Sequence, residues 1–172
     1  MVDWLWRRTD AIAAWWSFAA LFALVIVFVV LFNRYGAHYP EKSFDGHRYG
    51  VGRADIERIL PSFDRAKQLD QYLAQETQLD LVFPAIYSLC FAVLIVLLRP
   101  RGWRWLIVVP YATAFFDYCE DVCFIALVLH YRAAHDVPPA LAIVASIASR
   151  LKWAFLLVLT PAVVIAAIRH FR

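Results

Sequence analysis

Charged residues are scarce in this chain. Asp, Glu, Lys and Arg make up 18% of its 172 residues, whereas hydrophobic residues make up 63%. This balance, with a mean hydropathy of +0.60, is not that of a soluble domain. The formal net charge is only +3, so nothing in the charge points to nucleic acid as a partner.

Cysteine and glycine are also scarce, with three and five copies. An odd number of cysteines, all inside apolar stretches, argues against a disulfide framework. The glycines form no phosphate-binding loop, and the sequence has no Ser-His-Asp arrangement or nucleotide motif, so we expect no cofactor. The apolar segments are continuous rather than alternating, which excludes a membrane β-barrel.

What the chain has instead is four long apolar stretches, at residues 11–32, 81–98, 106–129 and 140–168. A bilayer core of about 30 Å needs about 20 helical residues, so each stretch is long enough to cross it. The first has no charged residue, and we interpret it as a retained anchor because it is too long for a signal peptide and lacks a cleavage pattern. We predict an all-α integral membrane four-helix bundle, with residues 1–172 as a single domain.

The short flanks of these stretches predict an orientation. With four spans, both termini share a side with the turn at residues 99–104. That side carries Arg7, Arg8, Arg99, Arg101, Arg104, Arg169 and Arg172. The positive-inside rule therefore predicts a bacterial inner-membrane protein with both termini in the cytoplasm. Most tryptophans cluster at the same interface, as an aromatic belt does: Trp4, Trp6, Trp15, Trp16, Trp103 and Trp105.

Residues 33–79 form an extramembrane segment between the first and second spans. Its first part is rich in Gly, Tyr, His and Pro and predicts an irregular loop, and helical periodicity begins at Arg53. We expect Pro61 to stop or kink a first short helix and Ser62 to cap a second one. The second helix has no evident stop, so it is expected to continue into the second span.

Three carboxylates lie in the middle of the third apolar stretch. At 100° per residue, Asp117, Glu120 and Asp121 share about a third of the helix circumference, together with Thr113 and Phe124. A carboxylate facing lipid at that depth would cost several kcal/mol. The three acids must therefore face protein, water, a cation or a substrate.

The neighbouring helices offer groups that can meet these acids. Asp80 lies at the outer mouth of the second span, and Tyr87 lies about 10 Å deeper on the same face. On the fourth helix Lys152 shares a face with Ser149 and is about as deep as Asp117. Arg150 points some 160° away and is expected at the interface, where it can snorkel.

Three acids around one lysine cannot all ionise cheaply, so one carboxyl is expected to keep a proton that it can donate. We predict Asp117 and Glu120 as an acid–base pair, with Lys152 and Tyr87 orienting the substrate or stabilising charge. Substrate-binding residues would be Asp80, Asp121, Phe124 and Ser149. Four external histidines lack the spacing of a zinc site, and we predict no metal among the site residues, although a divalent cation held by the carboxylates stays an alternative.

Two motifs and one lysine carry a resemblance. Asp80-Leu-Val-Phe-Pro84-x-x-Tyr87, Asp117-x-x-Glu120-Asp121 and Lys152 together resemble a group of small bacterial four-helix membrane proteins of uncharacterised function, over residues 53–168. That group usually has Asn where this chain has Asp121, which adds a carboxylate here. A more distant likeness is to the sterol isomerase and sigma-2 receptor superfamily, from which no catalytic residue is carried across because the motif order does not transfer.

The leading functional expectation is an intramembrane acid–base site that binds or transforms a lipid, isoprenoid or sterol-like molecule. One alternative is a small proton-coupled transporter, in which the same acids titrate. The other is a non-catalytic assembly subunit whose polar network fixes helix register. The expected partners are membrane lipids or a lipid-like molecule, with a homodimer left open.

Overall fold

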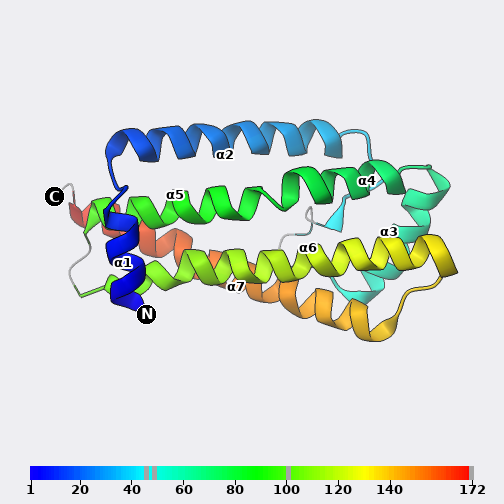
Figure 1. The fold of residues 1–172 in the computed structure, drawn as a ribbon. Coiled ribbons are helices and arrows are strands. Elements are labelled where there is room, and N and C mark those ends of the chain that lie inside the picture. The colour runs from blue at the N-terminus through cyan, green and yellow to red at the C-terminus, as the bar shows by residue number, and fades with distance from the viewer. Residues whose placement is uncertain (45–46, 48–49, 100–101, 171–172) are drawn as a thin grey trace.

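The structure is a computed structural model that describes residues 1–44, 47, 50–99 and 102–170. Its regular elements are all helical over these residues, as predicted. The long helices run along one axis, and shorter helices close the two ends (Figure 1). Two of the arginines used to predict the orientation, Arg101 and Arg172, lie outside the described residues.

Helix α2, Trp15–Gly36, is the first long element. It begins four residues after the predicted start, where the Ala14 N–H donates to Ser17 Oγ at 3.0 Å. All of its residues are described and none is buried. Its main neighbour is α5, against which the Phe28 ring stacks on Phe83 at 5.7 Å. Such an outward-facing apolar helix fits a hydrocarbon environment, in which its side chains need no protein cover.

Before α2 comes a short helix, α1, Val2–Asp10, which the sequence patterns did not predict. It lies across one end of the bundle, near the start of α6 (Figure 1). Its Trp6 is buried, with the Arg104 guanidinium 5.2 Å above the ring centre. Thr9 Oγ1 pairs with the Tyr111 hydroxyl at 3.0 Å. Trp6 therefore serves as a core residue of this end rather than as part of an exposed aromatic belt.

At the opposite end, α3 spans Arg53–Arg65 and passes through Pro61. The prediction that Pro61 and Ser62 divide this segment into two helices is wrong. The division comes at Lys67, which adopts a left-handed φ of 56°, and α4 follows at Leu69–Gln75. A proline inside a helix removes one backbone hydrogen bond, a loss that packing of the buried face of α3 can offset.

The second span has a wide turn at its start. A π-helix, η2, Glu76–Asp80, continues α4, and after Leu81 and Val82 comes α5, Phe83–Leu98. The predicted continuation of the external helix into this span is thus confirmed, over Leu69–Leu98. Pro84 sits in the first turn of α5, where a missing N–H costs little, so it starts this helix instead of kinking it.

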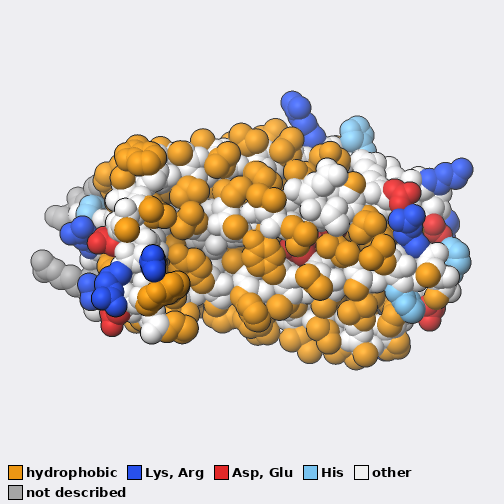
Figure 2. Space-filling model, in the orientation of Figure 1, with side chains coloured by type: hydrophobic (Ala, Val, Ile, Leu, Met, Phe, Trp, Pro, Cys, Tyr) orange, Lys and Arg blue, Asp and Glu red, His pale blue; other side chains and the backbone are white. Residues whose placement is uncertain are grey.

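The last two long helices are α6, Val108–Ala134, which follows the 3₁₀ turn η3, Arg104–Ile107, and α7, Pro139–His170. Of the helices in the described part of the chain, three are long and apolar enough to cross a membrane: Trp15–Gly36, Leu69–Leu98 and Pro139–His170. Helix α6 is long enough but carries the acids. Charged side chains gather at the two ends of the molecule, and an apolar band lies between them (Figure 2).

Two hydrophobic clusters fill the two halves of the bundle. One, at the α3 end, includes Phe44, Phe63, Phe124 and Leu127. The other, at the α1 end, includes Trp6, Ile95, Leu106, Leu159 and Val163. On α6 the first cluster starts at Cys123 and the second ends at Val109, so the predicted acids lie in a polar layer between two apolar cores.

The segment after α2 is attached to the bundle at several points. The Phe44 ring stacks on Phe124 at 4.4 Å, and the Val51 N–H donates to Ser149 Oγ at 3.0 Å. Gly50 has a φ of 88°, and a Cβ added there would lie 2.9 Å from the backbone nitrogen of Arg150. Close backbone approach at Gly50 is therefore what lets this segment pack on α7.

Substitution of Gly50 by alanine should lower the stability of the protein much more than Gly102→Ala. Both glycines have a positive φ, but a Cβ at Gly102 meets nothing within 4 Å. The backbone strain is common to both variants, about 1 kcal/mol, whereas the clash adds about 1–3 kcal/mol at Gly50 alone. Thermal unfolding in detergent would measure the difference, and equal losses would contradict the close approach.

Candidate functional site

The centre of the polar layer is a contact between three helices. The Tyr87 hydroxyl of α5 donates to Asp117 Oδ2 of α6 at 2.8 Å. Lys152 Nζ of α7 lies 2.5 Å from Asp117 Oδ1 and 2.6 Å from Glu120 Oε2. The predicted meeting of Lys152 with the acids is thereby confirmed, and so is the inward direction of all three carboxylates.

Burial makes this network electrostatically strong. The side chains of Asp117, Glu120 and Lys152 are 7%, 1% and 11% exposed. Two carboxylates flank one ammonium, so attraction within the group offsets the large cost of removing these charges from water. The network also joins α6 to α7 at the middle of their length. It therefore fixes the register of the two helices.

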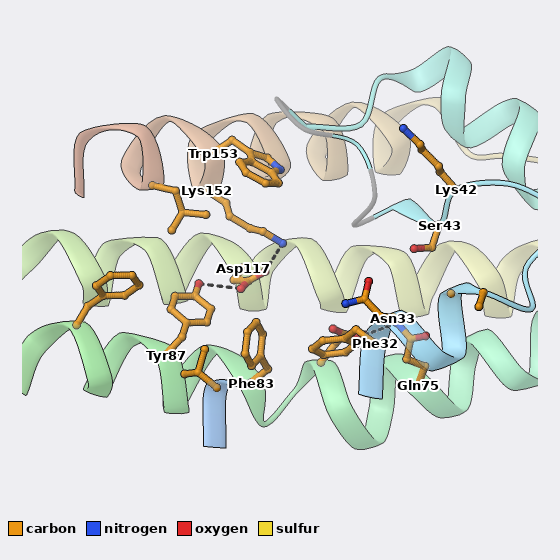
Figure 3. A pocket seen from close by; sticks show the side chains of 16 residues that line it. Phe32, Asn33, Lys42, Ser43, Gln75, Phe83, Tyr87, Asp117, Lys152 and Trp153 are labelled. Carbon is orange, nitrogen blue, oxygen red and sulfur yellow. Dashed lines mark hydrogen bonds and ion pairs between the residues drawn. The ribbon is translucent and has the colours of Figure 1, made fainter. Parts of the chain in front are cut away.

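A pocket of about 670 Å³ lies against one side of this network. Tyr87, Asp117 and Lys152 reach its wall, and Figure 3 shows their side chains converging on one another. The rest of the lining comes from α2, the segment after it, α4, η2, α5 and α7: Val25, Phe32, Asn33, Gly36, Ala37, Lys42, Ser43, Gln75, Asp80, Phe83, Phe91, Trp153 and Leu156. The lining is mostly apolar, with polar groups at a few positions, as in ligand pockets generally.

Glu120 has a different position from Asp117. Glu120 is not among the residues that line the pocket, and its Oε2 contacts Lys152 Nζ at 2.6 Å. Of the two predicted members of the acid–base pair, Asp117 is placed to touch a ligand and Glu120 is placed to act on Lys152. The residues that can reach a bound molecule from this layer are Tyr87, Asp117 and Lys152.

A second polar group lies toward the α3 end of the pocket. The Tyr39 hydroxyl donates to Gln75 Oε1 at 2.7 Å, and Gln75 Nε2 donates to Asp80 Oδ2 at 3.2 Å. Asp80 is 8% exposed and lines the pocket. Hydrogen bonding at both ends fixes the orientation of the Gln75 amide, with its oxygen toward Tyr39 and its nitrogen toward Asp80.

The π-helix explains how Gln75 and Tyr87 come to face one pocket. On an uninterrupted α-helix, two residues twelve positions apart point about 120° away from each other. A π-turn takes up one extra residue, which removes about 100° of rotation. The wide turn at Glu76–Asp80 therefore aligns the polar face of α4 with the polar face of α5.

Three of the predicted substrate-binding residues lie away from the pocket wall. Phe124 is fully buried against Phe44 in the core of the α3 end. Ser149 accepts the Val51 N–H and so anchors the segment above α7. Asp121 is 1% exposed within the polar layer. Asp80 is the member of this predicted set that reaches the pocket.

Several pocket residues were missed by sequence reasoning, namely Asn33, Lys42, Ser43, Gln75 and Trp153. Asn33 directly follows the first long apolar run, which is a signal that could have been read, whereas Gln75 lies in the polar stretch before the second run. Lys42 and Ser43 belong to a stretch without periodicity, and no local pattern predicts which way they turn.

Among the His, Cys, Asp and Glu side chains of the described chain, no group of three or more is arranged to hold a metal ion. Two of the external histidines pair with acids instead, His130 with Asp136 at 2.7 Å and His135 with Asp64 at 3.9 Å.

The arrangement can hold and move a proton next to an apolar ligand. Tyr87 and Lys152 each place a donor hydrogen on Asp117, and all three groups face the pocket. A hydroxyl, carbonyl or amine of a ligand at this wall could exchange a hydrogen bond with any of them. Comparisons with known protein families, with characterised proteins and with solved structures find no match for this chain.

Removal of the Lys152 charge should destabilise the protein strongly. In Lys152→Met two buried carboxylates lose their shared cation, which costs about 3–5 kcal/mol. The matched control is Arg150→Met, which removes the same charge from an exposed position two residues away and should cost no more than about 0.5 kcal/mol.

Unfolding in detergent, followed by circular dichroism, measures both variants. Addition of Asp117→Asn and Glu120→Gln to Lys152→Met should restore most of the lost stability, because the uncompensated charges are then gone. Equal stability of Lys152→Met and Arg150→Met would refute the proposed contribution of the Lys152 ion pairs to the free energy of unfolding.

Proposed function

We propose that this protein is a membrane protein whose intramembrane acid–base site binds a lipid-like molecule and can transform it. The observation that carries the proposal is the pocket of about 670 Å³, apolar over most of its wall, with Tyr87, Asp117 and Lys152 on one side. This volume lies within the range of pockets that enclose a small organic ligand. Buried acids beside an apolar pocket are rare in membrane proteins except where they serve a function.

The roles follow from which groups reach the pocket. Asp117 is the proton acceptor or donor nearest the ligand, and Tyr87 holds one of its oxygens at 2.8 Å. Lys152 supplies a positive charge that can stabilise negative charge developing on the ligand. Glu120 is a positioning residue, because it holds Lys152 at 2.6 Å from outside the pocket.

The surroundings of the site favour this function over the two alternatives. Below the polar layer, toward the α1 end, the helices are packed by an apolar cluster that includes Ile95, Leu106 and Leu159, each 0% exposed. Such a core is a barrier to protons and ions, which supports a pocket with one closed end rather than a transport path. A network that served packing alone would have no need of the adjoining cavity, because close-packed interiors leave few voids.

In the membrane, α2, Leu69–Leu98, α6 and α7 would form the four spans. Three of these have the length and composition required. Helix α6 would be the fourth, because its three acids are buried inside the bundle and lipid would meet its apolar side chains. The basic α1 end would lie in the cytoplasm and the α3 end outside, in a bacterial inner membrane.

This orientation can be tested by cysteine labelling in intact cells. Arg8 and Lys67 are exposed at the α1 and α3 ends, whereas the three native cysteines lie within α5 and α6. A membrane-impermeant maleimide should label Lys67→Cys in intact cells and Arg8→Cys only after lysis. The reverse pattern would invert the orientation, and labelling of both in intact cells would refute four spans.

Occupancy of the pocket can be tested by lipid mass spectrometry on the purified protein. Val25 lines the pocket, whereas Val27, on the same helix, is 51% exposed and lies outside it. In Val25→Trp the larger side chain should fill the space and reduce co-purified lipid-like molecules at least fivefold. Val27→Trp adds the same side chain on the outer face of α2 and should leave them unchanged.

Both tryptophan variants should fold equally well, which circular dichroism and size-exclusion chromatography would check. If the parent protein and Val25→Trp retained the same molecules in the same amounts, the pocket would not be the binding site and the proposed function would fail.

A further inference from the structure

We propose that the ligand of this pocket is a single-chain phospholipid of the lysophospholipid class. It would lie lengthwise beside α2, with its phosphate at Lys42 and the end of its chain near Val25. This inference rests on the proposed function and adds the ligand class, its direction and its route into the site.

The shape of the pocket carries the first step. Along α2 its lining runs from Val25 to Gly36, which is about 16 Å at 1.5 Å per residue. The lining follows the same axis on α5, from Phe91 to Tyr87, and on α7, from Leu156 to Lys152. A long and narrow volume of about 670 Å³ suits one hydrocarbon chain with a small headgroup.

The polarity of the lining changes along this length. Near the α3 end the wall holds Asn33, Lys42, Ser43 and Gln75, which Figure 3 shows together at one end of the pocket. At the other end, one helical turn beyond the polar layer, the lining residues are Val25, Phe91 and Leu156. An amphiphile satisfies both ends when its headgroup meets the first set and its chain meets the second.

The charges at the α3 end select the headgroup. Lys42 is exposed and brings a positive charge to the mouth of the pocket, where a phosphate can pair with it while remaining partly hydrated. Asp80 lies in the same part of the wall, is 8% exposed and accepts a hydrogen bond from Gln75. A carboxylate repels a phosphate but accepts from a hydroxyl. A glycerol phosphate carries both groups, so it complements Lys42 and Asp80 together.

The ligand would reach the pocket sideways from the leaflet on the α3 side. Lining residues come from both α2 and α7, yet the main contacts of α2 are with α5. The pocket wall between α2 and α7 is therefore not closed by packing of these two helices against each other. A lipid could enter there with its chain already parallel to the helices, without exposing the chain to water.

Photolabelling tests the assignment with the full-length protein in phosphatidylcholine nanodiscs. The two probes are a lysophosphatidic acid and a monoacylglycerol, each with a diazirine at the end of the same chain, so that they differ only in the phosphate. The lysophosphatidic acid should label residues around Val25, Phe91 and Leu156. It should do so about fivefold more than the monoacylglycerol, the factor that one partly solvated charge pair can supply.

The matched variants are Lys42→Gln, which removes the charge at the mouth, and Lys67→Gln, which removes an exposed charge at the same end of the molecule outside the pocket. Lys42→Gln should abolish the preference for the phosphate-bearing probe, and Lys67→Gln should preserve it.

The outcomes separate this inference from the function on which it rests. Equal labelling of the Val25 end by both probes, unaffected by Lys42→Gln, would overturn the phosphate assignment while still supporting a lipid pocket. Chain-end labelling near Lys42 would overturn the direction. Labelling that Val25→Trp does not reduce would instead refute the pocket as the binding site, and with it the proposed function.

Discussion

The structure depends on one ammonium group shared by two buried carboxylates. Lys152 meets Asp117 and Glu120 at 2.5 and 2.6 Å in the middle of two long helices. Lipid chains carry no positive charge that could pair with these carboxylates. Helix α6 can therefore occupy an apolar environment only while α7 lies beside it in this register. The other long helices are then constrained in turn, because Tyr87 brings α5 to the same carboxylate. These contacts fix the relative register of α5, α6 and α7, whose apolar surfaces alone would not specify it.

The same interaction separates two carboxylates by their position relative to the pocket. Asp117 uses one oxygen for Lys152 and the other for Tyr87, and it still reaches the pocket. Glu120 is behind Lys152 and shielded from the pocket. In the proposed function stability and chemistry are therefore carried by neighbouring groups: Glu120 secures the lysine, and Asp117 faces the pocket.

The sequence predicted the parts of this arrangement that follow from local rules. Continuous apolar stretches give the long helices, and 100° spacing gives the common face of Asp117, Glu120 and Asp121. The cost of burial gives Lys152 as their partner. It did not predict where Phe124 and Ser149 point, because both are taken by the segment after α2, whose path depends on the left-handed Gly50. Helix α1 was also missed, since its nine residues are too few for periodicity to stand out and its burial depends on Arg104 and Tyr111, about a hundred residues away.

The π-turn at Glu76–Asp80 shows most clearly why local patterns stop short of the site. A regular helix through these residues would satisfy every propensity in the sequence, and it would point Gln75 away from Tyr87. A π-turn costs backbone hydrogen-bond geometry, and such turns persist where tertiary contacts require them. Here the contacts are those of Tyr39 with Gln75 and of Gln75 with Asp80, which form only when α4 is rotated toward the pocket. Helices α4 and α5 thus share one polar face because the chain gains more from these buried hydrogen bonds than it loses in helix regularity.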